Sequence, residues 1–243
     1  IKAFNDILKP LGIKKCGIRL DSGDIAYLSR KARKMLDEAG WENCTITVSN
    51  SLDEYLIQDL WMQDAKIDAF GVGERLITAK SEPVFGCVYK LVAVEDKDGN
   101  VTPKIKISEN VGKITTPHFK KLYRFYGRDT GKAIADYLTV YDETVDDSKN
   151  LEIFDPDATW KRKEVYHFEA RELLVPIYQK GKLVYKRPSV EEIKTYCAEQ
   201  VDTLWDEVKR FDNPHNYYVD LSQKLYDIKT RLLNEKNERR EQN

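Results

Sequence analysis

Hydrophobic positions in the first 82 residues alternate between two spacings. Residues 16–20, 44–48 and 67–72 are short runs of apolar and β-branched side chains, which predict β-strands. Between these runs, apolar residues recur every three or four positions, as on one face of an α-helix. Because alternating strands and helices are typical of a parallel sheet, we expect an α/β region over residues 1–82.

Local signals predict where several helices begin or end. Gly40 follows the first helical pattern and predicts its end. Ser51 and Glu54 have the spacing of a capping box, in which a hydroxyl and a carboxylate bind free backbone N–H groups of the first helical turn. Ser189 and Glu192 have the same spacing and predict the start of a later helix.

The pattern changes after Pro83. Residues 88–94 and 104–107 flank a turn at residues 97–100, which predicts an antiparallel hairpin. We therefore expect an antiparallel α+β region over residues 83–188. Its further short strands are expected near residues 121–125, 133–140, 173–177 and 183–185.

Two helices and a tail are expected over residues 189–243. The apolar spacing extends the first helix to Phe211 and starts the second at Leu221. Strands 16–20, 44–48 and 67–72 are too few to close a barrel, which needs eight, but they could be the last part of one.

Composition and charge argue against several classes of protein. The chain has 40 Lys and Arg against 41 Asp and Glu, so it lacks the basic excess of a nucleic-acid-binding protein. No apolar run approaches the ~20 residues that a membrane helix needs. The four cysteines have no C-x-x-C spacing and are interpreted as reduced thiols. We expect a cytoplasmic protein with neither nucleic acid nor membrane as a partner.

Polar residues follow each strand predicted in residues 1–82. The three clusters are residues 19–24 (RLDSGD), 49–51 (SNS) and 71–75 (GVGER). Because parallel strands have their carboxyl ends at the same edge of a sheet, these clusters are expected to lie together, where α/β folds bind ligands.

The first cluster has two interpretations. Arg19 and Asp21 lie on the same face of a strand, where a guanidinium can bind a carboxylate or phosphate and a carboxylate can bind sugar hydroxyls or hydrated Mg²⁺. An ordinary ion pair beside a helix cap formed by Ser22 or Asp24 explains the same residues equally well. Both interpretations remain open at this point.

The other two clusters are weaker evidence for a ligand-binding site. Gly71 and Gly73 expose backbone N–H groups ahead of a short helix, which can bind a phosphate, but a tight structural turn has the same sequence. Ser49 and Asn50 are explained for the most part by a helix cap.

The three histidines are poor candidates for metal or catalytic chemistry. His118, His167 and His215 have no metal-ligand spacing to one another or to a cysteine, so no zinc site is expected. His215, in an Asn-Pro-His sequence, is interpreted as a loop hydrogen-bonding residue rather than a catalyst.

Five motifs follow one another along the chain: residues 18–24 (IRLDSGD), 48–54 (VSNSLDE), 70–78 (FGVGERLIT), 103–108 (PKIKIS) and 213–217 (NPHNY). Together they resemble the C-terminal half of a nicotinate phosphoribosyltransferase. The resemblance covers essentially the whole chain in order, and the first motif is highly specific.

This resemblance implies an ATP-coupled, ligase-type reaction of NAD salvage. Nicotinate and phosphoribosyl pyrophosphate would give nicotinate mononucleotide and pyrophosphate, with Mg²⁺ and ATP required. The implied fold is an irregular TIM-like α/β barrel, of which residues 1–82 would be the last strands and helices. The implied assembly is a homodimer.

The resemblance also implies roles for individual residues. Arg19 would contact the pyridine carboxylate or stack on the ring, and Asp21 would hold the ribose hydroxyls directly or through Mg²⁺. Ser49 and Asn50, with Gly71 and Gly73, would receive the 5′-phosphate, and Glu74 would belong to the substrate-binding residues without an assigned contact.

The chain departs from the family pattern in two respects. The family uses a histidine that ATP phosphorylates and that lies upstream of the Arg-Asp motif, whereas the three histidines here lie downstream, so none takes that role. The aromatic residue and the arginine that complete the base pocket of the family are also absent. Because the chain begins at Ile1 inside a helical pattern, we expect a piece of a longer protein that is inactive alone.

Two alternatives remain. A nicotinamide phosphoribosyltransferase has a similar Arg-x-Asp-Ser-Gly-Asp stretch, and a choice between nicotinate and nicotinamide as substrate separates the two enzymes. The other alternative is a non-catalytic scaffold that binds phosphoribosyl pyrophosphate without turning it over.

Overall fold

The computed structural model forms two compact units, Ile1–Cys87 and Val88–Asn243, and each is described by itself. The structure describes residues 1–241, with side chains through residue 235, so the end of the expected tail lies outside the described residues. The division of the chain into regions 1–82, 83–188 and 189–243 stays a prediction.

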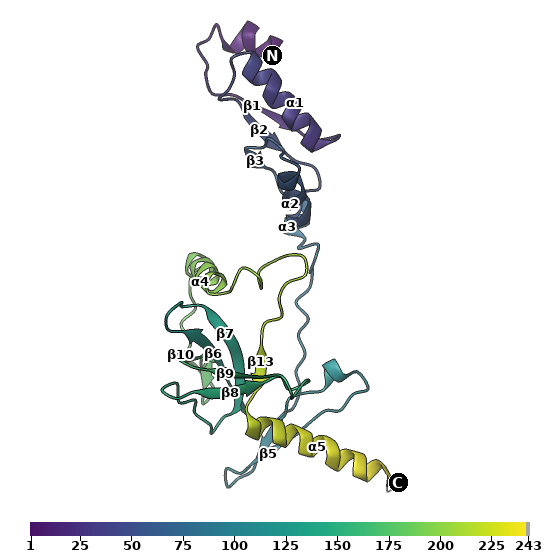
Figure 1. Cartoon of the computed structure of the whole chain (residues 1–243), viewed down its shortest axis with the longest axis vertical. Helices are drawn as coiled ribbons and strands as arrows, with labels where there is room; N and C mark the ends of the chain where they lie inside the picture. Colours follow the sequence, from purple (N-terminus) through teal and green to yellow (C-terminus); the bar gives the residue numbers. More distant parts are fainter. Residues whose placement is uncertain (242–243) are drawn as a thin grey trace. The chain divides into compact units, whose positions relative to one another are not determined.

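The first unit contains a three-stranded parallel sheet with helices between its strands (Figure 1). The strand order is β1-β2-β3, and both pairings are parallel. The elements are η1 (Phe4–Leu8), β1 (Gly17–Leu20), α1 (Ile25–Glu38), β2 (Thr45–Val48), α2 (Glu54–Met62), β3 (Ala69–Phe70) and α3 (Glu74–Ile77). The carboxyl ends of the three strands therefore meet at one edge of this sheet, as the alternating pattern predicts.

The core of this unit lies around the central strand. Ile46 and Val48 of β2 are completely buried. They belong to one apolar cluster with Leu36 of α1 and Leu60 of α2. Burial of such side chains stabilises the fold by about 1.5–3 kcal/mol each, so the sheet can present polar residues at its edge.

Aspartate residues cap both long helices of the first unit. Asp24 accepts a hydrogen bond from Tyr27 N at 2.9 Å, so Asp24 rather than Ser22 caps α1. Asp53 accepts one from Leu56 N at 2.9 Å and caps α2. The expected capping box at Ser51 is wrong because the chain turns at Ser51 with a φ of 49° and the helix begins only after Asp53.

The second unit contains a four-stranded mixed sheet and several hairpins (Figure 1). Its strand order is β10-β6-β7-β13, and β13 pairs with β7 in parallel while the other pairs are antiparallel. The elements are β4 (Ala93–Glu95), β5 (Val101–Pro103), η2 (Val111–Lys113), β6 (Lys120–Gly127), β7 (Ala133–Val140), β8 (Leu151–Phe154), β9 (Arg162–Val165), β10 (Phe168–Glu172), β11 (Tyr178–Gln179), β12 (Lys182–Leu183), α4 (Val190–Asp202), β13 (Val219–Leu221) and α5 (Gln223–Glu241).

Aromatic residues form the main core of the second unit. Phe125 of β6 and Phe168 of β10 are both completely buried, with ring centroids 4.7 Å apart. Tyr137 and Ile153 pack in the same cluster. The opposite face of β6 and β7 carries the Arg124–Asp136 pair, because side chains alternate along a strand.

Several sequence expectations differ from the structure in the second unit. The helix expected to reach Phe211 ends at Asp202, although its Ser189–Glu192 capping box is confirmed. Leu221 belongs to β13 rather than to a helix, because it pairs with Leu138 of β7 and is buried. The strand expected near residues 173–177 is wrong, because these residues lie between β10, which ends at Glu172, and β11, which begins at Tyr178. A short apolar run can form a strand or a helix, and pairing with distant strands decides which.

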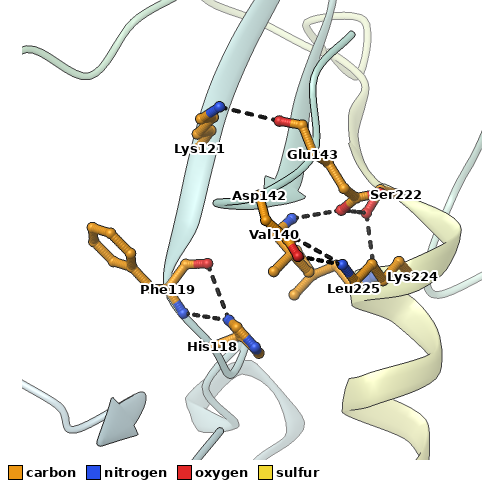
Figure 2. Close-up of polar contacts among 9 residues, drawn as sticks. All are labelled: His118, Phe119, Lys121, Val140, Asp142, Glu143, Ser222, Lys224 and Leu225. Atoms are coloured by element: carbon orange, nitrogen blue, oxygen red, sulfur yellow. Dashed lines mark hydrogen bonds and ion pairs between the residues drawn. The ribbon is translucent and has the colours of Figure 1, made fainter. Parts of the chain in front are cut away.

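Polar contacts join the end of β7 to the start of α5 (Figure 2). The Glu143 carboxylate accepts hydrogen bonds from Val140 N at 2.7 Å and from the Ser222 hydroxyl at 2.8 Å. Lys121 donates to the Glu143 carbonyl at 3.1 Å, and Lys224 forms an ion pair with Asp142 at 2.8 Å. These contacts satisfy polar groups at the sheet end, which is a structural role.

Candidate functional site at the carboxyl ends of β1, β2 and β3

Three side chains predicted for the site form a closed hydrogen-bond network. Arg19 Nε donates to Ser49 Oγ at 2.8 Å, and the Ser49 hydroxyl donates to Asp21 Oδ1. Arg19 Nη2 lies 3.2 Å from the same Asp21 oxygen. The Ser49 hydrogen bond and then the Arg19 guanidinium lower the pKa of Asp21, so this carboxylate is charged at neutral pH.

The arginine and the carboxylate remain open to solvent. The side chains of Arg19 and Asp21 are 66% and 59% exposed, whereas Ser49 is buried beneath them. A guanidinium has several N–H donors and a carboxylate has two oxygens, so both groups keep hydrogen-bonding capacity beyond this network. The structure thus contains both the Asp24 helix cap and the ion pair, and still leaves two charged groups available to a ligand.

The loops after β2 and β3 lie against each other. Gly71 N donates to Val48 O at 2.7 Å, and a Cβ at Gly71 would lie 3.4 Å from the Ser49 Cβ. Asn50 has a φ of 98°, a left-handed conformation that non-glycine residues rarely adopt. Gly73 precedes α3, whose first turn has backbone N–H groups without intrahelical partners.

The structure brings some of the predicted residues together and not others. Arg19, Asp21 and Ser49 are in direct contact, and Gly71 adjoins Ser49. Among the described residues, no hydrogen bond or ion pair joins the side chains of Asn50 and Glu74 to this group.

An ion pair that the sequence analysis missed links the same two loops. Arg75 of α3 donates to Asp53, the cap of α2, and the two side chains are 27% and 21% exposed. The pKa of Asp53 is lowered, first by the Leu56 N–H and then by the Arg75 hydrogen bond. The sequence does not single out Asp53 as the helix cap, because Ser51 is also a plausible cap for the same helix.

The histidines all lie in the second unit and have contacts of their own. His118 accepts a hydrogen bond from Phe119 N at 2.9 Å and stacks on Tyr141 (Figure 2 shows its link to Phe119). His167 Nε2 lies 3.1 Å from Asp129, and His215 Nδ1 lies 2.8 Å from Asn216 O. Each of these contacts joins the histidine to a residue of its own unit.

Asp21 is the candidate contact for Mg²⁺, and its surroundings fit a limited role. Within the described chain, no group of three or more His, Cys, Asp and Glu side chains could hold a metal ion. Mg²⁺ usually keeps several waters and binds one or two carboxylates together with substrate phosphates. The charged, exposed Asp21 therefore fits an ion delivered with a phosphorylated substrate, rather than a protein cage.

A cavity of about 520 Å³ lies elsewhere, in the second unit. Its lining includes His167, Trp205, His215 and Tyr217 but no residue of the β1–β3 edge.

Among the described residues, no helix combines the length and the apolar character that crossing a bilayer requires.

Comparisons with known proteins cover most of the chain. Residues 119–229 match the family model "Nicotinate phosphoribosyltransferase C-terminal domain". The nicotinate phosphoribosyltransferase of Bacillus subtilis is 46% identical over 227 residues, which cover 90% of this chain and 46% of that protein. The chain belongs to the nicotinate phosphoribosyltransferase family.

One further relative and two solved structures are also similar to this chain. The nicotinate phosphoribosyltransferase of Dictyostelium discoideum is 34% identical over 90% of this chain and 39% of its own length. The crystal structure of human nicotinic acid phosphoribosyltransferase matches 90% of this chain and 40% of its own, with a TM-score of 0.64 and 26% identity. A nicotinate-nucleotide pyrophosphorylase from Pyrococcus furiosus shares the fold over 77% of this chain and 40% of its own, at a TM-score of 0.50 and 24% identity. This chain spans less than half the length of each of these relatives.

Proposed function

We propose that this chain contributes to the reaction of nicotinate with phosphoribosyl pyrophosphate, which gives nicotinate mononucleotide and pyrophosphate in NAD salvage. The observation that carries the proposal is the exposed Arg19–Ser49–Asp21 network at the carboxyl ends of three parallel strands. Membership of the nicotinate phosphoribosyltransferase family supports this choice over a nicotinamide-specific enzyme.

In this proposal, Arg19 binds nicotinate and Asp21 binds the ribose of phosphoribosyl pyrophosphate. The Arg19 guanidinium binds the pyridine carboxylate or stacks on the ring, for which its exposed face and planar charge are suited. The Asp21 carboxylate holds the ribose hydroxyls or an ion bound to the substrate. Positive charge develops at the anomeric carbon as pyrophosphate leaves, and a nearby fixed carboxylate stabilises that charge.

The loops after β2 and β3 receive the 5′-phosphate. Ser49 and Asn50 supply the loop after β2, and Gly71, Gly73 and Glu74 supply the loop after β3. Glycine permits the close approach of backbone N–H groups to a phosphate, and the first turn of a helix has such groups free. The close approach of Gly71 to Ser49 supports a shared role of the two loops.

Mg²⁺ and ATP complete the chemistry in this proposal. When bound, Mg²⁺ neutralises charge on the departing pyrophosphate. Asp21 would be the residue of this chain that holds the ion, directly or through water, while ATP hydrolysis would drive synthesis through a histidine that this chain does not supply.

The assembly in this proposal is larger than one chain of this length. The β1–β3 sheet forms the last strands of a TIM-like α/β barrel, and the active enzyme is a cytoplasmic homodimer. The 243-residue chain alone is inactive, because neither the phosphorylated histidine nor a complete base pocket is among its residues.

One assay tests the reaction and its alternatives. The natural gene product that carries this sequence is incubated with phosphoribosyl pyrophosphate, Mg²⁺ and ATP, and pyrophosphate release is measured with nicotinate or nicotinamide. Release with nicotinate only is expected. Release with nicotinamide only would assign the protein to the nicotinamide enzymes, and binding without release from either base would support a non-catalytic scaffold. The 243-residue chain is assayed in parallel, and turnover by it would contradict the inactivity proposed here.

A further inference from the structure

The ion pair between Arg75 and Asp53 connects the two loops that would bind the 5′-phosphate. Arg75 lies two residues after Gly73, and Asp53 lies three residues after Asn50. One Asp53 oxygen accepts from Leu56 N at 2.9 Å, and the other accepts from Arg75. Both oxygens of this carboxylate are therefore used inside the protein, and its cation comes from the neighbouring loop.

The segment between Ser49 and Asp53 is strained and held at both ends. Asn50 and Ser51 have φ values of 98° and 49°, which persist in non-glycine residues only when their surroundings enforce them. At one end, Ser49 is bound by Arg19 and itself donates to Asp21. At the other end, the Asp53 carboxylate links the segment to α2 and to α3.

We infer that Arg75 and Asp53 are positioning residues that keep the loops after β2 and β3 at the separation that a single phosphate requires. This inference rests on the proposed function. The pair is only 21–27% exposed and internally satisfied, so it acts through the backbone of the loops rather than by contact with substrate. A mispositioned binding group weakens recognition strongly, because hydrogen bonds to a phosphate depend on distance and direction.

Kinetics of the natural gene product with Arg75→Ala test the inference. The KM for phosphoribosyl pyrophosphate is expected to rise by about tenfold or more, while the KM for nicotinate stays within about twofold. Arg75→Lys keeps a cation for Asp53 and is expected to recover most of the loss. A purely structural pair would change both KM values alike or neither, and either result would overturn the inference.

A matched control separates the loss of this ion pair from the loss of any ion pair. Lys66→Ala removes the 2.6 Å pair with Asp64 in the same unit, and neither of these residues belongs to the loop after β2 or to the loop after β3. Its KM values are expected to match those of the wild type. Hydrogen exchange in peptides covering residues 48–56 is expected to be faster in Arg75→Ala than in Lys66→Ala, and equal rates would contradict a positioning role.

Direct binding keeps this inference distinguishable from the proposed function. Calorimetry measures the affinity for phosphoribosyl pyrophosphate without any turnover. If the wild type binds it but releases no pyrophosphate, the proposed function fails, and a weakening of about tenfold in Arg75→Ala still supports the positioning role. If the wild type binds no phosphoribosyl pyrophosphate, both fail. Equal affinity of wild type and Arg75→Ala would overturn the inference alone.

Discussion

Each of the two units contains an arginine–aspartate pair, and the two pairs differ in exposure and in hydrogen-bond partners. In the first unit, Arg19 and Asp21 are 66% and 59% exposed and lie 3.2 Å apart. In the second unit, Arg124 and Asp136 are 21% and 12% exposed and lie opposite each other on β6 and β7. Arg124 binds both oxygens of Asp136, at 2.7 and 2.9 Å, and the Tyr217 hydroxyl donates to the same carboxylate at 3.0 Å.

This difference shows how surroundings separate a binding group from a structural one. The Asp136 carboxylate is bound by Arg124 of the neighbouring strand and by Tyr217 from the loop before β13, so a ligand has little left to bind. The Arg19–Asp21 pair is fixed by Ser49 from below and faces solvent, so its remaining hydrogen bonds go to water or to a ligand. Substitutions in the two pairs should therefore affect stability in one unit and activity in the other.

The largest effect is expected for Asp136→Ala in the second unit. The change leaves the Arg124 guanidinium and the Tyr217 hydroxyl without their shared carboxylate, so stability should fall by about 3 kcal/mol. Urea unfolding measures this loss. Asp142→Ala, which removes the exposed pair with Lys224, is the matched control and should cost much less stability. Equal losses in the two variants would contradict the distinction drawn between buried and exposed pairs.

Arg19→Ala should show the opposite behaviour. In the natural gene product, kcat/KM with nicotinate is expected to fall by about a hundredfold, because a charged group that binds substrate is lost. Unfolding in urea should change by less than about 1 kcal/mol, since the pair is exposed. Arg162→Ala, which removes an exposed pair with Glu152, should leave kcat/KM unchanged. A variant that loses stability but keeps its activity would show that Arg19 is structural.

A third aspartate, Asp220, extends the comparison to a buried carboxylate without an ion-pair partner among the described residues. Burial, and then the nearby Asp155 charge, raise the pKa of Asp220 to about 6, while Lys163 opposes the shift. The native state therefore holds a proton that the unfolded state has released, so stability falls as pH rises from about 4 to about 6. Asp220→Asn should remove this fall and add about 1–2 kcal/mol at pH 7.5.

Urea unfolding of the wild type and Asp220→Asn at several pH values measures this effect. Other carboxylates titrate in both proteins, so the difference between the two curves isolates Asp220. The two stabilities should converge below about pH 4. A constant difference across the pH range would show that the charge of Asp220 is not responsible.

The smallest effect is expected at the helix cap beside the candidate site. Asp24→Ala removes the hydrogen bond to Tyr27 N and should cost about 1 kcal/mol. If Asp24 is only a cap, Asp24→Ser should recover this stability, and kcat/KM should stay within about twofold of the wild type in both variants. A large loss of activity in Asp24→Ser would extend the binding group beyond Arg19 and Asp21.

Much of the first unit could be predicted from local patterns. The alternation of apolar runs and helical spacing predicted β1, β2 and β3, and the position of polar residues after them predicted the edge where Arg19, Asp21 and Ser49 meet. The second unit was less predictable. Its β13 is a three-residue strand whose Leu221 continues an apparent helical pattern, and only pairing with β7 reveals it.

The sequence alone determined the parallel order of the first unit and the chemical character of its edge, because strand period, helix period and turn residues are local properties. The tertiary structure decided which charged groups are bound by other groups of the protein and which remain exposed. Asp53 became a cap bound to Arg75 and Asp136 became saturated, while Asp21 stayed open, although all three are aspartates beside an arginine. The reason is that burial and hydrogen-bond partners come from residues distant in the chain, and no local pattern records them.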